Sequence, residues 1–249
     1  MNRLMVILLL VTSGLLAKDY ALIVGISNYK NIGKLSHIES DIKTYKKILS
    51  SRGVKEVRIL KNSNATKTKI KNYLAYVVQD MKSFKNNRFF MFFAGHGIST
   101  KYLQNNSQIE NAKLLQYLTD SGVILPYEYD DKNLANTIII GKRDLRPYLI
   151  EIDKRINESL IIFDACYSGN SIRGTKLTIT PFIYSNPIDF PYNNIVYIAS
   201  ATSRNKAKSG VLSSVLNSCI SKQSNLRELR VCMNNKLMYT GQRAVIVSK

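Results

Sequence analysis

Two uninterrupted apolar runs constrain the fold of this 249-residue chain more than any other feature. Residues 159–164 read SLIIFD and residues 88–94 read RFFMFFA, and small or polar residues follow each run directly. A strand that is apolar on both faces must be covered on both faces, which is typical of a parallel sheet between two layers of helices. The two runs therefore predict buried strands of an α/β fold.

Strand-like and helix-like segments alternate along the rest of the chain. The expected strands are Tyr20–Ile26, Val54–Leu60, Arg88–Ala94, Ser159–Asp164, Ile195–Ser200 and Arg243–Ser248. The expected helices are Glu39–Arg52, Lys67–Lys82, Ser107–Leu118, Gly141–Ile152, Gly210–Ser221 and Leu226–Asn234. This alternation predicts a mostly parallel six-stranded sheet with helices on both faces. No repeat or low-complexity linker interrupts residues 18–249, so we expect one domain.

Each of the two apolar runs leads directly to a reactive side chain. His96 stands in FFAGHG and Cys166 stands in FDACYSG, where reactive groups collect at the carboxyl edge of a parallel sheet. An imidazole within reach of a thiol can take its proton and create the nucleophilic thiolate. Either residue alone is more often a satisfied histidine or a small buried hydrophobe. Both together, at glycine-flanked strand ends, favour a Cys–His thiol hydrolase.

Four motifs occur in a fixed order: ALIVGISNY (21–29), FFAGHG (92–97), ILPYEYDD (124–131) and FDACYSG (163–169). With them the chain resembles the caspase-like cysteine peptidases, specifically the bacterial metacaspase-like, or orthocaspase-like, branch. The resemblance implies a caspase-like three-layer sandwich and cysteine-type endopeptidase activity, with Cys166 as nucleophile and His96 as general acid and base. It also implies that the backbone amides of Gly97 and Cys166 stabilise the oxyanion of the tetrahedral intermediate.

An acidic residue marks the difference from caspases proper. Caspases carry Gln-Ala-Cys where this chain has Asp164-Ala165-Cys166. The resemblance to metacaspases implies that Asp164, together with Asp41 in LSHIESDIKTYKKIL, binds a substrate Lys or Arg before the cleaved bond. Two carboxylates suit this task because a guanidinium offers a planar fork of donors. The alternative for Asp41 is an ordinary acidic residue in the first turn of a helix.

The long segment 169–194 follows the nucleophile, where this family often carries an activation cleavage site. Arg173 and Lys176 are the candidate self-cleavage sites in this segment. The alternative is that both are solvated charges of a basic protein.

Calcium is a candidate cofactor by resemblance alone, since metacaspases often need it. Glu128, Asp130 and Asp131 bring three oxygen-rich side chains together in the sequence. This cluster does not by itself define a metal site.

The first residues have the pattern of a secretory signal. Arg3 precedes an apolar stretch, residues 4–16, which is too short for a confident membrane span, and Ala17 precedes a polar sequence. We expect residues 1–17 to be a signal peptide and the mature protein to be periplasmic or secreted. The alternative is an uncleaved membrane anchor.

Export changes the meaning of the three cysteines. In an oxidising compartment an odd number leaves one thiol unpaired, and Cys166 is the obvious free one. Cys219 and Cys232 then either pair as a disulfide or stay as two separate buried thiols.

The formal charge of +19 attracts nucleic acid, anionic lipid or acidic protein surfaces. The lysines are spread along the chain without a nucleic-acid fold signature, so composition bias is the preferred explanation and no nucleic-acid partner is expected. We expect a protein or peptide substrate with a basic residue before the cleaved bond. The second hypothesis is a catalytically silent caspase-like binding or regulatory module.

Overall fold

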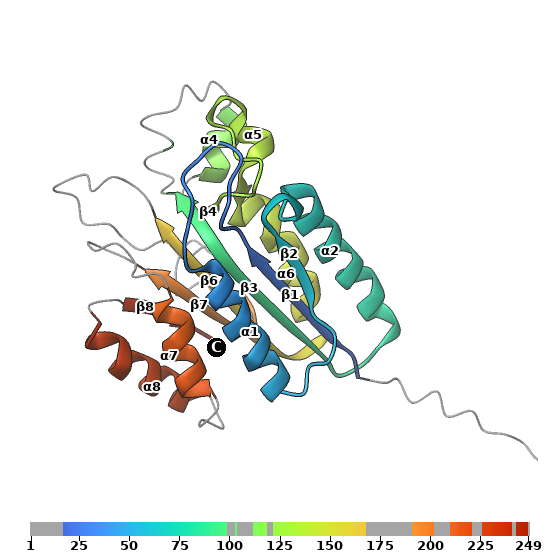
Figure 1. The fold of residues 1–249 in the computed structure, drawn as a ribbon. Helices are drawn as coiled ribbons and strands as arrows, with labels where there is room; N and C mark the ends of the chain where they lie inside the picture. Colours follow the sequence, from blue (N-terminus) through green and yellow to red (C-terminus); the bar gives the residue numbers. More distant parts are fainter. Residues whose placement is uncertain are drawn as a thin grey trace, which may run out of the picture.

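The computed structural model describes residues 17–98, 103, 112–118, 122–167, 191–201, 210–220, 226–240 and 243–248. This part of the chain forms an eight-stranded sheet, in which six strands follow the order β2-β1-β3-β6-β7-β8 (Figure 1). Off this path, β4 pairs with β3, and β5 pairs with β4. The strands are β1 (Asp19–Gly25), β2 (Arg58–Lys61), β3 (Asn87–Ile98), β4 (Val123–Ile124), β5 (Ile139–Ile140), β6 (Ile156–Tyr167), β7 (Ile195–Ala201) and β8 (Arg243–Val247). The α-helices are α1 (Ile38–Ser51), α2 (Lys67–Asp80), α4 (Ala112–Leu118), α5 (Leu134–Thr137), α6 (Arg146–Asp153), α7 (Val211–Ile220) and α8 (Leu226–Met238). Short helical turns occur at η1 (Asn62–Asn64), η2 (Met81–Ser83), η3 (Asp131–Asn133) and η4 (Gly141–Leu145).

The expected α/β architecture is confirmed. Strands β2, β1, β3, β6 and β7 run parallel, whereas β8 is antiparallel to β7. The centre of the sheet is formed by β3 and β6, whose apolar runs were the two expected buried strands. The carboxyl ends of these two strands therefore lie side by side.

Helices cover both faces of the sheet because alternate residues of β3 point to opposite sides. Phe89, Met91 and Phe93 pack in one core cluster with apolar side chains of α2 and α6. Phe90 and Phe92 pack in the other cluster with side chains of α1, α7 and α8. The sheet is thus the middle layer of three.

Three details differ from the sequence-based expectation. Strand β2 begins at Arg58 instead of Val54. The helix expected over Gly141–Ile152 begins as the π-helical turn η4 and becomes α-helical only at α6. In this turn the buried Asp144 accepts a hydrogen bond from the Ile140 amide. The antiparallel strands β4 and β5 were not expected, since two residues each are too short to show a period of two.

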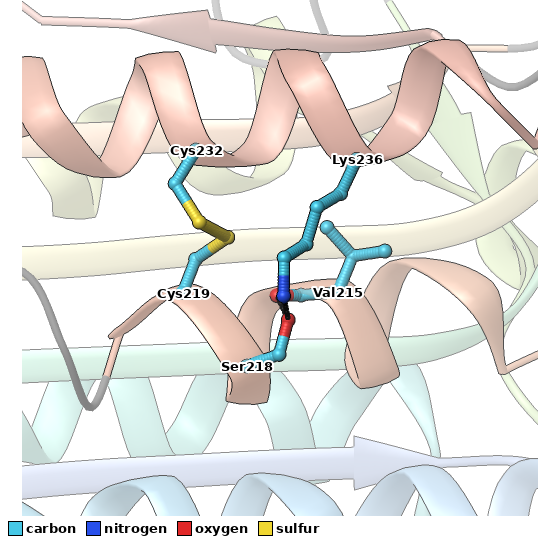
Figure 2. The surroundings of a disulfide bond; sticks show 5 residues. All are labelled: Val215, Ser218, Cys219, Cys232 and Lys236. Atoms are coloured by element: carbon cyan, nitrogen blue, oxygen red, sulfur yellow. Dashed lines mark hydrogen bonds between the residues drawn. A yellow bond between two sulfur atoms is a disulfide. The ribbon is translucent and has the colours of Figure 1, made fainter.

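A disulfide bond joins the two C-terminal helices, which decides between the two alternatives left open for these cysteines. Cys219 on α7 and Cys232 on α8 are bonded, with their Cα atoms 5.8 Å apart (Figure 2). Beside this bond, the Lys236 ammonium donates to Ser218 Oγ at 2.8 Å. The disulfide fixes α8 to the helix that packs against α1.

Removal of this disulfide is expected to destabilise the fold. The bond spans 13 residues, and closing a loop of that size stabilises a fold by about 3 kcal/mol in the loop-entropy model. The Cys219→Ser/Cys232→Ser variant should therefore lose about 2–4 kcal/mol of unfolding free energy in urea titrations. As a control, addition of a reductant should lower the unfolding free energy of the wild type and leave that of the variant unchanged. Equal stability of both proteins without reductant would contradict the expectation.

Candidate active site

The register of β3 and β6 places the two candidate catalytic residues opposite each other. His96 pairs with Cys166, and Gly97 pairs with Tyr167, across adjacent parallel strands. Both residues were expected beyond the ends of their strands, but β3 and β6 continue through them. The backbone distance between the candidate base and the candidate nucleophile is therefore set by the hydrogen-bonded ladder of the sheet.

The His96 ring is held in one tautomer by a backbone carbonyl. Its Nε2 lies 3.0 Å from the Gly33 carbonyl oxygen. A carbonyl only accepts, so Nε2 carries the proton of the neutral ring and Nδ1 is the basic nitrogen. Nδ1 is buried and has no hydrogen-bond partner among the described residues. Burial lowers the pKa of His96 below its ordinary value, and the hydrogen bond to Gly33 partly offsets this. The imidazole is thus neutral and able to accept a proton near pH 7.

Tyr29 contacts both the backbone and the ring of His96. The His96 backbone amide donates to Tyr29 Oη at 2.6 Å, and the two rings are tilted with their centroids 4.9 Å apart. A Cβ atom on Gly95 would lie 2.5 Å from the same Oη, so only glycine fits there. Tyr29 was not among the residues expected at the site, although it closes the first motif of the family pattern, residues 21–29.

The two acidic residues lie close together on the side of the sheet that α1 and α7 cover. Asp164 on β6 is half-buried, and Asp41 on α1 is only 2% exposed. The Tyr45 hydroxyl donates a long hydrogen bond of 3.4 Å to Asp164 Oδ2. The Ser213 hydroxyl donates to Asp41 Oδ1 at 2.7 Å. Neither hydroxyl was expected from the sequence, because both residues lie in ordinary amphipathic helices.

Asp41 and Asp164 would repel each other if both carboxyl groups were ionised. The pKa of Asp164 is raised to about 7, because burial and then the charge of Asp41 raise it more than the hydrogen bonds from Ser200 and Tyr45 lower it. Burial also raises the pKa of Asp41. Within the described ranges, neither carboxylate forms a salt bridge. Two carboxylates that share a site disfavour each other's ionisation, and a cation between them removes this cost.

The remaining candidates are placed as follows. Gly97 lies in β3 between Ile124 of β4 and Tyr167 of β6, one register position beyond the His96 and Cys166 pair. Its role in the oxyanion hole, with the amide of Cys166, stays a prediction. Arg173 and Lys176 lie outside the described residues.

The acidic cluster considered for calcium does not fit that ion. Glu128 Oε1 accepts from the Lys67 backbone amide at 2.8 Å, and Asp130 Oδ1 accepts from the Lys132 amide at 3.0 Å. No group of three His, Cys, Asp or Glu side chains is arranged to hold a metal in the part of the chain that the structure describes. We therefore derive no step through calcium.

These features define the class of the protein: an α/β protein with a candidate Cys–His site at the centre of its sheet. The family model of the caspase domain, peptidase C14, matches residues 18–244. The chain therefore belongs to the caspase domain family of cysteine peptidases. A protein of Geobacter sulfurreducens, known from a structural genomics crystal structure, is 16% identical with a TM-score of 0.57 over 93% of this chain and 94% of its own. This likeness shows the fold. Among curated proteins, none matches the chain significantly.

A methyl group at Gly95 is expected to disturb His96 through Tyr29. In Gly95→Ala the new Cβ would overlap Tyr29 Oη, so the hydroxyl must move away from the His96 amide. We expect a loss of about 1–3 kcal/mol in unfolding free energy and a fall in kcat of at least about tenfold. The control is Gly33→Ala, since Gly33 has open space around it and keeps its carbonyl. Equal kcat values for wild type and Gly95→Ala would exclude this role of Tyr29.

Proposed function

We propose that the protein is an exported, metacaspase-like cysteine endopeptidase that cleaves peptide bonds after Lys or Arg. The observation that carries the proposal is the carboxylate pair of Asp41 and Asp164, which forms no salt bridge among the described residues. Asp164 stands two residues before the candidate nucleophile Cys166. A basic substrate side chain supplies the missing positive charge.

The dyad performs the chemistry in two stages. Nδ1 of His96 takes the proton of the Cys166 thiol, and the thiolate attacks the carbonyl carbon of the substrate. The amides of Gly97 and Cys166 are the candidate donors to the oxyanion. The imidazolium then gives its proton to the leaving amine as the C–N bond breaks. Water, deprotonated by His96, hydrolyses the thioester, and the proton returns to the sulfur.

The acidic pair supplies the specificity. Asp164 is the more exposed of the two, since it is half-buried whereas Asp41 is only 2% exposed. An ionised Asp164 binds a guanidinium or ammonium group, and the charge of Asp41 strengthens the attraction. A substrate aspartate at the same position would add a third negative charge, which disfavours it.

Export is supported by two independent features. The apolar stretch 4–16 before Ala17 has the pattern of a signal peptide, and Cys219 and Cys232 form a disulfide, which persists in oxidising compartments. No helix in the described ranges is long and apolar enough to cross a membrane.

Self-cleavage at Arg173 or Lys176 remains part of the proposal.

A panel of matched peptides tests the proposed specificity. Peptides that carry Arg, Lys, Asp or Gln before a reporter amide are hydrolysed by the purified protein at pH 8. We expect kcat/KM for Arg or Lys to exceed that for Gln by at least about a hundredfold, since a buried charge pair is involved. Cys166→Ala should be inactive on all of them. Cleavage only after Asp would refute the acidic pocket, and no cleavage by correctly folded wild type would favour the silent-module hypothesis.

The acidic pocket also predicts how KM depends on pH. The pKa of Asp164 is raised to about 7, so the carboxylate is ionised above that pH and protonated below it. KM for the Arg peptide should therefore rise as the pH falls through about 7. The pKa of His96 is lowered, so kcat should fall only at more acidic pH.

The Gln peptide is the control for this pH dependence, because its binding needs no charge. Its KM should stay nearly constant between pH 6 and 8. In Asp164→Asn the pH dependence of KM for the Arg peptide should disappear together with the preference for Arg. A KM for the Arg peptide that does not change with pH in the wild type would contradict the assignment.

A further inference from the structure

Ser213, which lies outside both central strands, forms a hydrogen bond with one member of the acidic pair. Ser213 lies near the start of α7, 172 residues after Asp41 in the sequence. Its side chain is buried between α7 and α1, and its hydroxyl donates to Asp41 Oδ1 at 2.7 Å. No step of the proposed mechanism uses this serine, and no motif of the sequence points to it.

The surroundings of Ser213 suit both protonation states of Asp41. The hydroxyl lies 2.7 Å from the carboxylate and 3.1 Å from the Gly210 carbonyl oxygen, but its single proton serves one acceptor at a time. When Asp41 is ionised, the hydroxyl donates to the carboxylate. When Asp41 is protonated, the carboxyl group donates to Oγ and the hydroxyl turns to Gly210. Ser213 thus keeps the side chain of Asp41 in place in either state.

Removal of this donor would leave a buried charge poorly solvated. Asp41 is 2% exposed, and Ser213 supplies the hydrogen bond that its carboxylate accepts among the described residues. In the part of the chain that the structure describes, the charged and titratable groups that interact with it are His37 at the N-cap of α1, Tyr45 on α1 and Asp164 on β6. Burial raises the pKa of Asp41 above its ordinary value, and the hydrogen bond from Ser213 and then the charge of His37 lower it in part. The hydrogen bond therefore favours the ionised carboxylate.

We propose that Ser213 is a positioning residue for specificity: its hydroxyl holds Asp41 ionised behind Asp164 and so sets the affinity for a basic substrate side chain. This inference rests on the proposed function. Ser213 acts through Asp41, because its hydroxyl is directed to that carboxylate inside the interface of α1 and α7. Its loss should therefore weaken substrate binding and leave the catalytic step intact.

The test measures kcat and KM for the Arg and Gln peptides with wild type, Ser213→Ala and the control Ser214→Ala. Ser214 is exposed on the same helix, so Ser214→Ala makes the same change in helix propensity as Ser213→Ala without altering a buried residue. We expect Ser213→Ala to raise KM for the Arg peptide about tenfold, the loss typical of one hydrogen bond to a charged group. The expected kcat stays within about twofold, and KM for the Gln peptide is unchanged. Ser213→Thr, which keeps the hydroxyl, should restore KM.

A double-mutant cycle distinguishes positioning from a general loss of structure. In an Asp41→Asn background there is no charge for Ser213 to favour, so adding Ser213→Ala should not raise KM for the Arg peptide further. If Ser213→Ala does not fold, Ser213→Cys takes its place, since the thiol keeps the volume and is a weak donor.

The outcomes separate this inference from the proposed function. A wild type without preference for Arg or Lys overturns both. A wild type with that preference, combined with an unchanged KM for Arg in Ser213→Ala, overturns the role of Ser213 alone. An equal rise of KM for Arg and Gln peptides, or an additive effect in the Asp41→Asn background, overturns it as well.

Discussion

The parallel pairing of β3 with β6 is the constraint on which the rest of the structure depends. Side chains of both strands are buried on both faces, so a shift of one residue would move aromatic residues from one core cluster into the other. The same ladder sets His96 opposite Cys166. The hydrophobic core thereby fixes the backbone geometry of the candidate dyad, so that two residues 70 positions apart in the sequence lie opposite each other.

The acidic pair depends on a different part of the fold, the contact of α1 with the sheet and with α7. A side chain at Gly25 would overlap Ile42, so glycine lets α1 lie close against β1. This close approach brings Asp41 into the neighbourhood of Asp164 and Ser213. The cost of burying two carboxylates there is met only in part by hydroxyl donors, which is the physical reason to expect a cationic ligand.

The features that could be predicted from the sequence are those that short stretches of neighbouring residues encode. Cys166, His96 and Asp164 follow apolar runs, and the order of strands and helices shows in the periodicity of the chain. The pairing of Asp41 with Asp164 came from family resemblance, and the structure brings the two residues together, although substrate binding at the pair stays a proposal. Ser213 escaped prediction because its role arises from a contact between distant helices. The hairpin of β4 and β5 escaped because its strands are shorter than one recognisable pattern.

The separate origins of the dyad and the acidic pair affect how such a protein can evolve. The dyad belongs to the central strands, where nearly every change disturbs the core, whereas Asp41 and Ser213 belong to two outer helices. Under the proposed function, substitutions in these helices would alter which substrates are accepted while the strands that carry His96 and Cys166 stay intact. Proteins that descend from one ancestor with this sheet can therefore differ in substrate preference while they keep the same reaction.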